Sequence, residues 1–181
     1  YQAPFVKNKF ITFGSFNNFK KINDDVVKAW SQILLKVKNS KLILKASTNS
    51  SSNFLLNKFK NYGVDSSVNI IPYKKEFSDH INEYKKIDLA LDTFPYNGVT
   101  TSFEAIWMGV PILTMNGYNF NSRCGVSINK NLGMNSLIAE NIEDYVLKAI
   151  NLTKNINELD KLREHTFEKS ISSPLFNIKN F

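Results

Sequence analysis

Cysteine and arginine are scarce in this chain of 181 residues, which has one cysteine, Cys124, and only two arginines. A single cysteine excludes an intrachain disulfide and is compatible with a reducing compartment, so we expect a cytoplasmic protein. No apolar run approaches the roughly 20 residues that span a bilayer, and no signal peptide is recognisable. We therefore expect no membrane contact, and Cys124 fits a small buried hydrophobic residue better than a reactive thiol.

The positive charge of the chain comes almost wholly from lysine. The formal net charge is +7, but the lysines are scattered and form no run interleaved with aromatic residues. Nucleic-acid-binding proteins usually gather basic residues on one face. The scatter indicates a solvated surface, and we expect no nucleic-acid partner.

Several nucleotide-binding and metal-binding motifs are also missing. Gly14 is the single glycine at the end of the first predicted strand, a region where NAD-binding domains carry three. The P-loop pattern Gly-x-x-x-x-Gly-Lys-Ser/Thr does not occur, and neither does an Asp-x-Asp motif that could hold a divalent ion on a diphosphate. These absences argue against nicotinamide and flavin dehydrogenases, and we expect no cofactor and no metal.

Short apolar runs alternate regularly with amphipathic stretches along the chain. The pattern predicts strands at 9–16, 41–45, 68–71, 89–91 and 112–114 and a minimal one at 136–139. It predicts helices at 24–38, 54–59, 76–84, 101–108, 142–152 and 156–170. Because strands this apolar must be covered on both faces, we expect an α/β fold, a Rossmann-like doubly wound parallel sheet. A chain of this length that is 43% hydrophobic suits one domain, residues 1–181.

Two segments are expected to lack regular structure, a polar linker at 47–53 and an extended stretch at 172–176. Residues 154–181 are therefore predicted to form a C-terminal helix followed by an extended tail. The chain begins at Tyr1 without an initiator methionine, so we expect it to be a piece of a longer polypeptide.

The most informative stretch is 96–109, where Gly98 leads into the predicted helix at Thr100 and Thr101. Backbone N–H groups at a helix start lack intrahelical partners and lie at the positive end of the helix dipole, so with two hydroxyls beside them they suit a diphosphate. Glu104, one turn further, could reach a ribose hydroxyl. The pattern Thr101-x-x-Glu104 is equally that of a capping box, which needs no ligand. Residue chemistry alone leaves both interpretations open.

Three segments, at 16–22, 91–111 and 171–176, together resemble the C-terminal half of the O-linked N-acetylglucosamine transferases. These are peptide glycosyltransferases that include the SPINDLY-type proteins and bacterial relatives. The resemblance covers nearly the whole chain. It implies a GT-B fold, in which two Rossmann-like halves pair and the second half holds the nucleotide-sugar donor. This chain resembles only that second half.

The resemblance assigns a group of residues to the donor diphosphate. It places Lys21 against the phosphates, where an ammonium would neutralise charge on the departing nucleotide. It assigns Asn18 to the phosphates or the sugar, and the turn at Gly98 with Thr100 and Thr101 to the pyrophosphate. Without the resemblance, Lys21 would be taken for an ordinary exposed lysine at the start of a helix.

Two further residues are assigned to the nucleoside. Glu104 corresponds to an acidic residue that holds the ribose, and His80 to a histidine that packs on the base. A lone histidine on a helix face is more often structural, so the assignment of His80 depends on its neighbours. One departure stands out: Val99 lies where many relatives have histidine, so one polar contact to the diphosphate would be missing here.

We therefore expect the donor-binding domain of an inverting, metal-independent glycosyltransferase. It would take N-acetylglucosamine or glucose from a UDP-sugar and transfer it to protein side chains. An N-terminal half outside this sequence would supply the acceptor site and the general base, so the isolated domain is expected to be inactive. Two alternatives stay open: a nucleotide-sugar-binding module without catalysis, and half of a GT-B-like sugar-nucleotide epimerase.

Overall fold

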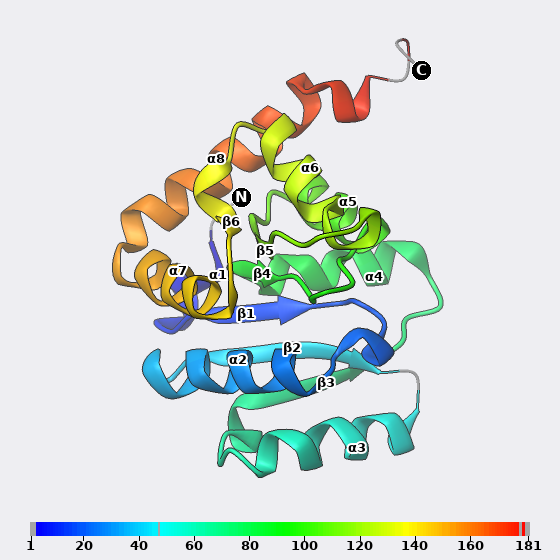
Figure 1. Ribbon diagram of the computed structural model, residues 1–181, viewed down its shortest axis with the longest axis vertical. Coiled ribbons are helices and arrows are strands. Elements are labelled where there is room, and N and C mark those ends of the chain that lie inside the picture. Colours follow the sequence, from blue (N-terminus) through cyan, green and yellow to red (C-terminus); the bar gives the residue numbers. More distant parts are fainter. Residues whose placement is uncertain (1–2, 47, 178, 180–181) are drawn as a thin grey trace.

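The computed structural model describes residues 3–46, 48–177 and 179, and these form one parallel sheet between layers of helices (Figure 1). The described strands are β1 (Thr12–Ser15), β2 (Lys41–Ala46), β3 (Val68–Pro72), β4 (Leu89–Leu91), β5 (Ile112–Met115) and β6 (Ile138–Ala139). They pair in the order β3-β2-β1-β4-β5-β6. This is the doubly wound order, with a reversal between β1 and β4, and it confirms the predicted fold class.

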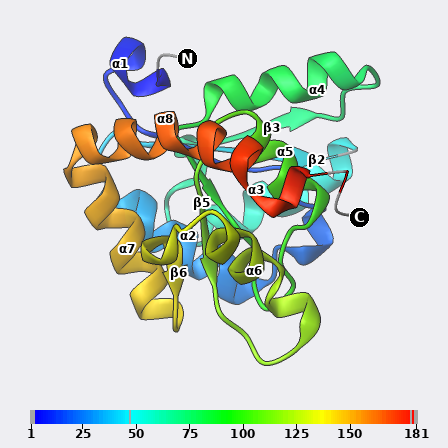
Figure 2. The ribbon, with the colours of Figure 1, turned by 90° about the horizontal axis from the view of Figure 1, so that it is seen from above.

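The helices are α1 (Pro4–Asn8), α2 (Asp24–Lys36), α3 (Asn49–Lys60), α4 (Phe77–Glu83), α5 (Thr100–Trp107), α6 (Cys124–Asn131), α7 (Ile142–Lys154) and α8 (Ile156–Ser172). Helix α2 packs against α3 and α7, while α5 packs against α6 and α8. Seen from above, α4 lies on one side of the sheet and α2 and α7 lie on the other (Figure 2). Both faces of the sheet are thus covered, which explains why the central strands β1, β4 and β5 are almost wholly buried.

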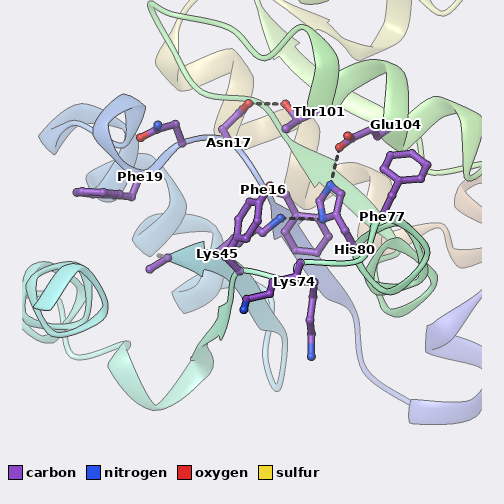
Figure 3. A pocket seen from close by; sticks show the side chains of 13 residues that line it. Phe16, Asn17, Phe19, Lys45, Lys74, Phe77, His80, Thr101 and Glu104 are labelled. Carbon is purple, nitrogen blue, oxygen red and sulfur yellow. Dashed lines mark hydrogen bonds and ion pairs between the residues drawn. The ribbon is translucent and has the colours of Figure 1, made fainter. Parts of the chain in front are cut away.

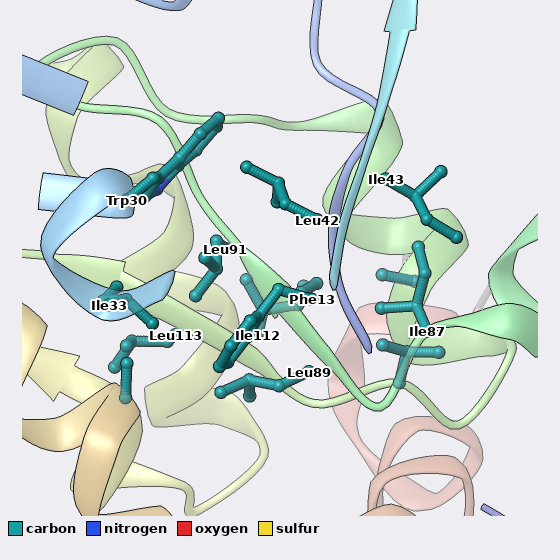
Figure 4. Packing of buried hydrophobic residues seen from close by; sticks show 14 of the residues in the cluster. Phe13, Trp30, Ile33, Leu42, Ile43, Ile87, Leu89, Leu91, Ile112 and Leu113 are labelled. Atoms are coloured by element: carbon teal, nitrogen blue, oxygen red, sulfur yellow. The ribbon is translucent and has the colours of Figure 1, made fainter. Parts of the chain in front are cut away.

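Helix α2 illustrates how local sequence and core packing agree. The Asn23 side chain caps it by accepting a hydrogen bond from the Val26 N–H, and two aspartates occupy its first turn. Its apolar face buries Trp30 and Ile33 completely, against strand residues that include Phe13 (Figure 4). The 3.6-residue spacing of its apolar positions therefore predicts correctly which face is buried.

Three local predictions are wrong and one helix was not predicted. The first strand is shorter than 9–16, because Pro4 starts a helical turn that ends at Lys9 in a left-handed conformation. The polar stretch 49–53 is not a linker but the first turns of α3, capped by Thr48; residue 47 lies outside the described residues. Helix α6 was not predicted, because its glycine and polar residues hide the apolar period.

The third wrong prediction concerns the tail. Residues 174–176 form a 3₁₀ turn rather than an extended segment, because the Ser173 hydroxyl accepts a hydrogen bond from the Leu175 N–H and Pro174 starts the turn. Residues 178, 180 and 181 of the predicted tail lie outside the described residues.

A buried carboxylate, Asp92, fixes the edge of the sheet at the end of β4. Its Oδ1 accepts hydrogen bonds from the Gly98 N–H at 2.7 Å, the Thr93 N–H at 2.9 Å and the Asn17 amide at 3.2 Å, and its Oδ2 accepts one from the Thr114 hydroxyl at 2.9 Å. These donors come from the ends of β1, β4 and β5 and from the turn before α5. Burial raises the pKa of Asp92 to about 6, although the four hydrogen bonds oppose this shift.

The raised pKa makes Asp92 visible in the pH dependence of stability. Between its ordinary pKa of 3.8 and its folded value of about 6, the folded state holds the proton more tightly than the unfolded state. We therefore expect the free energy of unfolding, measured relative to an Asp92→Asn variant, to fall by up to about 3 kcal/mol as pH rises through this window and then to level off. Urea denaturation at several pH values tests this. If the free energy of unfolding changed with pH by the same amount in the two proteins, the prediction would be contradicted.

Candidate functional site

A pocket of about 390 Å³ opens at the carboxyl edge of the sheet, beside the reversal in strand order (Figure 3). Phe16 follows β1, Lys45 lies near the end of β2 and Tyr73 follows β3. Helix α4 adds His80 and α5 adds Glu104. Ligands of open α/β sheets bind at this edge, and the sequence predictions for His80 and Glu104 fall on the pocket wall.

His80 lies at the centre of a chain of polar contacts on that wall. Its Nδ1 is 2.8 Å from the Lys45 ammonium, and its Nε2 is 2.8 Å from Oε2 of Glu104. The ring also lies within aromatic contact distance of Phe16, with ring centres 5.9 Å apart, and of Tyr84, with ring centres 5.7 Å apart. His80 is therefore fixed by neighbours on several elements, with part of its surface left in the pocket.

Glu104 does not take part in a capping box. Helix α5 has Val99 as its N-cap and no side-chain cap, and the Thr101 hydroxyl instead donates to Oδ1 of Asn17 at 2.5 Å. The Glu104 carboxylate accepts a hydrogen bond from the Tyr84 hydroxyl at 2.9 Å. Of the two interpretations that the sequence left open, the capping box is thus wrong. Burial, and then the negative charge of Glu104, raise the pKa of Tyr84 well above its ordinary value, so the Tyr84 hydroxyl stays a donor.

The start of α5 has the geometry of an anion site. The first intrahelical hydrogen bonds run from the N–H groups of Ser102 and Phe103 to the Val99 carbonyl, so the N–H groups of Thr100 and Thr101 precede them. Gly98 is needed at this turn, because a Cβ there would lie 2.6 Å from Oδ1 of Asn17. The threonines are therefore where the sequence analysis places them, at a helix N-terminus with its positive dipole end.

Lys21 reaches the same turn from the other side. It lies at the end of a 3₁₀ turn, Phe19–Lys21, and its ammonium donates to the Asn97 carbonyl at 2.8 Å and lies 4.1 Å from the centre of the Tyr96 ring. Desolvation lowers the pKa of Lys21, while nearby Asp92 and Cys124 partly offset this. An ammonium held by a carbonyl and a ring, beside a helix N-terminus, forms a positive site for an anion.

Asn18 has a structural contact in addition to the role expected for it. Its side-chain oxygen accepts a hydrogen bond from the Lys20 N–H and so caps the 3₁₀ turn that carries Lys21, although the residue still lines the pocket. The neighbouring Asn17 is the asparagine that joins the ends of β1 and β4, and no pattern in the sequence pointed to it. Lys45 was missed too, although a charged residue at the end of a buried strand was a signal.

The predicted residues thus form two adjoining groups. Lys21 lies by the turn at Gly98 and the start of α5, His80 and Glu104 lie on the pocket wall, and the contact between Asn17 and Thr101 connects them. Within residues 3–46, 48–177 and 179, no three His, Cys, Asp or Glu side chains gather as a metal site would require. None of the helices in the described part of the chain is long and apolar enough to cross a bilayer.

Comparison with known proteins places this geometry in a family. The model of glycosyl transferase family 41 matches residues 2–181. The chain is 39% identical over 177 residues to a probable UDP-N-acetylglucosamine–peptide N-acetylglucosaminyltransferase, SPINDLY, of Eustoma exaltatum, covering 96% of this chain and 19% of the relative. The chain therefore spans about a fifth of that relative's length.

Solved structures agree. A mutant O-GlcNAc transferase from Thermobaculum terrenum superimposes with a TM-score of 0.84 at 33% identity, over 90% of this chain and 32% of that one. WaaG, a glycosyltransferase involved in lipopolysaccharide biosynthesis, shares the fold with a TM-score of 0.67 at 14% identity, over 98% of this chain and 48% of that one. The fold is thus that of one half of a GT-B glycosyltransferase, and the chain belongs to glycosyl transferase family 41.

Proposed function

We propose that this chain is the donor-binding part of a metal-independent, inverting glycosyltransferase that transfers a sugar from a UDP-sugar to protein side chains. The observation that carries the proposal is the Lys21 ammonium, held against the Asn97 carbonyl beside the start of α5. The Eustoma relative is named for UDP-N-acetylglucosamine and a peptide acceptor, which favours N-acetylglucosamine as the sugar and a protein as the acceptor. Glucose is the second candidate sugar.

The diphosphate would lie between Lys21 and the start of α5. The ammonium would pair with one phosphate, while the N–H groups of Thr100 and Thr101 and the Thr100 hydroxyl would bind the other. The Thr101 hydroxyl already donates to Asn17. Asn18, at the rim of the pocket, would donate its amide to the phosphates or the sugar. Val99, which is 45% exposed at this turn, supplies no polar group, so binding depends more on Lys21.

The nucleoside would enter the pocket beyond the diphosphate. The base would pack against His80, with the rings of Tyr73 and Phe77 exposed nearby, and Glu104 would accept a hydrogen bond from a ribose hydroxyl. The Glu104 oxygen Oε2 already accepts from His80 and Tyr84, so Oε1 is the atom assigned to the ribose.

In the transfer step, an acceptor oxygen attacks the anomeric carbon from the face opposite the diphosphate, and the bond from that carbon to the phosphate oxygen breaks. Charge then grows on the departing nucleotide, where Lys21 and the dipole of α5 stabilise it. Fixed positive groups of this kind can replace a divalent cation. The general base and the acceptor site are assigned to the part of the protein outside this chain.

A sugar-nucleotide epimerase fits the pocket less well. Such an enzyme would be expected to bring carboxylates to the sugar, and among the described residues that line the pocket Glu104 is the sole acidic one. A module that binds the nucleotide without catalysis is the behaviour we expect of the isolated chain, because the acceptor half is needed for transfer.

Replacing Lys21 should weaken nucleotide binding more than folding. We expect Lys21→Ala to lower the affinity for UDP by about ten-fold or more, because a charge-assisted contact to phosphate is lost. Lys20→Ala is the matched control, since Lys20 lies in the same 3₁₀ turn with its side chain exposed. Isothermal titration calorimetry with melting curves for both variants makes the measurement, and equal affinities in the two variants would refute the role of Lys21.

Binding should not need a divalent ion. We expect the affinity for UDP to change by less than about two-fold between buffer with EDTA and buffer with millimolar Mg²⁺ or Mn²⁺, because the positive charge comes from Lys21 and the helix. Titrations in both buffers test this. A ten-fold gain with metal would contradict metal independence, whereas no binding of UDP by the folded chain in either buffer would overturn the donor site itself.

A further inference from the structure

Lys45 occupies a place in the pocket that the proposed reaction does not explain. It lies near the carboxyl end of β2, with its ammonium 2.8 Å from Nδ1 of His80 and 4.3 Å from the centre of the Tyr73 ring (Figure 3). One side chain thus contacts two walls of the pocket. Lys45 makes both contacts from β2, whose backbone is fixed by pairing with β1 and β3.

The contact with Lys45 decides where the proton of His80 lies. An ammonium has hydrogens to donate and no lone pair, so Nδ1 must accept and cannot carry a hydrogen. A neutral imidazole then carries its hydrogen on Nε2, which faces the acceptor Oε2 of Glu104. Lys45 as donor and Glu104 as acceptor therefore specify the same tautomer from the two sides of the ring.

The opposite arrangement would need a neutral amine that accepts from a hydrogen on Nδ1. The pKa of Lys45 is lowered by desolvation, and the negative charges of Glu104 and Glu83 oppose this shift. Glu83 is buried and paired with Lys86 at 2.7 Å, and Glu104 lies on the other side of His80. Two carboxylates so placed favour the charged ammonium, and an ammonium at Nδ1 requires that this nitrogen carry no hydrogen.

We propose that Lys45 is a positioning residue of the nucleotide pocket, which holds His80 as the neutral tautomer protonated on Nε2. The Nε2 hydrogen bond in turn holds Glu104 by Oε2, together with the Tyr84 hydroxyl, so that Oε1 is directed to the ligand. The same ammonium keeps Tyr73, which is 66% exposed, against the pocket by a cation–π contact. The assignment of a nucleotide to this pocket rests on the proposed function, whereas the tautomer rests on the geometry alone.

The tautomer can be read directly by NMR. The chain has two histidines, and His165 is exposed on α8, so a His165→Gln background leaves one ring to observe. In long-range ¹H–¹⁵N spectra of this parent protein at neutral pH, we expect a hydrogen on Nε2 and a lone pair on Nδ1. In Lys45→Met, Glu104 still accepts from Nε2 but Nδ1 loses its donor, so we expect rings with a hydrogen on Nδ1 to appear beside the Nε2 tautomer of the parent. Binding of UDP should weaken by about ten-fold, as expected for the loss of a charge-assisted contact.

Two variants separate this role from a general effect of charge. Lys45→Arg should keep the Nε2 tautomer, because a guanidinium also only donates. Lys74→Met removes a positive charge from the same pocket and should leave the tautomer as in the parent, since Lys74 makes no hydrogen bond to His80 in the described structure. Melting curves show that each variant is folded.

The proposal is overturned if folded Lys45→Met keeps the Nε2 tautomer, or if it changes the tautomer and still binds UDP as the parent does. A parent ring with its hydrogen on Nδ1 would overturn it as well. If the folded parent shows the expected tautomer and binds no UDP, the proposed function fails instead, and the spectra of the Lys45 variants still decide whether Lys45 controls His80.

Discussion

The carboxylate of Asp92 joins the segments on which the candidate site depends. It binds the Gly98 N–H, the Asn17 amide and the Thr114 hydroxyl, and so it holds the turn before α5 against the ends of β1 and β5. A buried carboxylate with four donors is stable only when all of them are in place. The position of the α5 N-terminus relative to the sheet is therefore set by a contact inside the protein, before any ligand arrives.

This arrangement has a consequence for binding. Lys21 is held by the Asn97 carbonyl and the Tyr96 ring, both from the loop that Asp92 anchors. A lysine held in place loses less side-chain entropy when an anion binds than a freely moving one, which favours the role proposed for Lys21 in binding a diphosphate. The partial desolvation of Lys21 would strengthen its interaction with an anion further, because the local dielectric constant is lower than in water.

The sequence was informative where function depends on local backbone geometry. A glycine followed by two threonines and an apolar helix predicts a helix N-terminus with hydroxyls beside it, and Gly98, Thr100 and Thr101 do form one. The sequence was not informative in this way for Lys21 and His80, because their residue chemistry alone favoured an ordinary surface lysine and a structural histidine. The family resemblance pointed to them, since it carries information about distant contacts that a single pattern lacks.

What the sequence could not show are the contacts between residues far apart in the chain. Asn17 and Thr101 are separated by 84 positions and Lys45 and His80 by 35, and no local pattern specifies that they meet. The pocket wall is built from such meetings, because each strand of a parallel sheet contributes one end to a common edge. The same principle explains the position of Lys45. A charge near the end of a buried strand is costly unless a polar group at the sheet edge pairs with it, and His80, which in turn contacts Glu104, is that group. In this fold, a charged residue near the end of an apolar strand is thus a better indicator of a site than a charged residue on a helix. A charge on a helix surface is solvated by water and needs no protein partner.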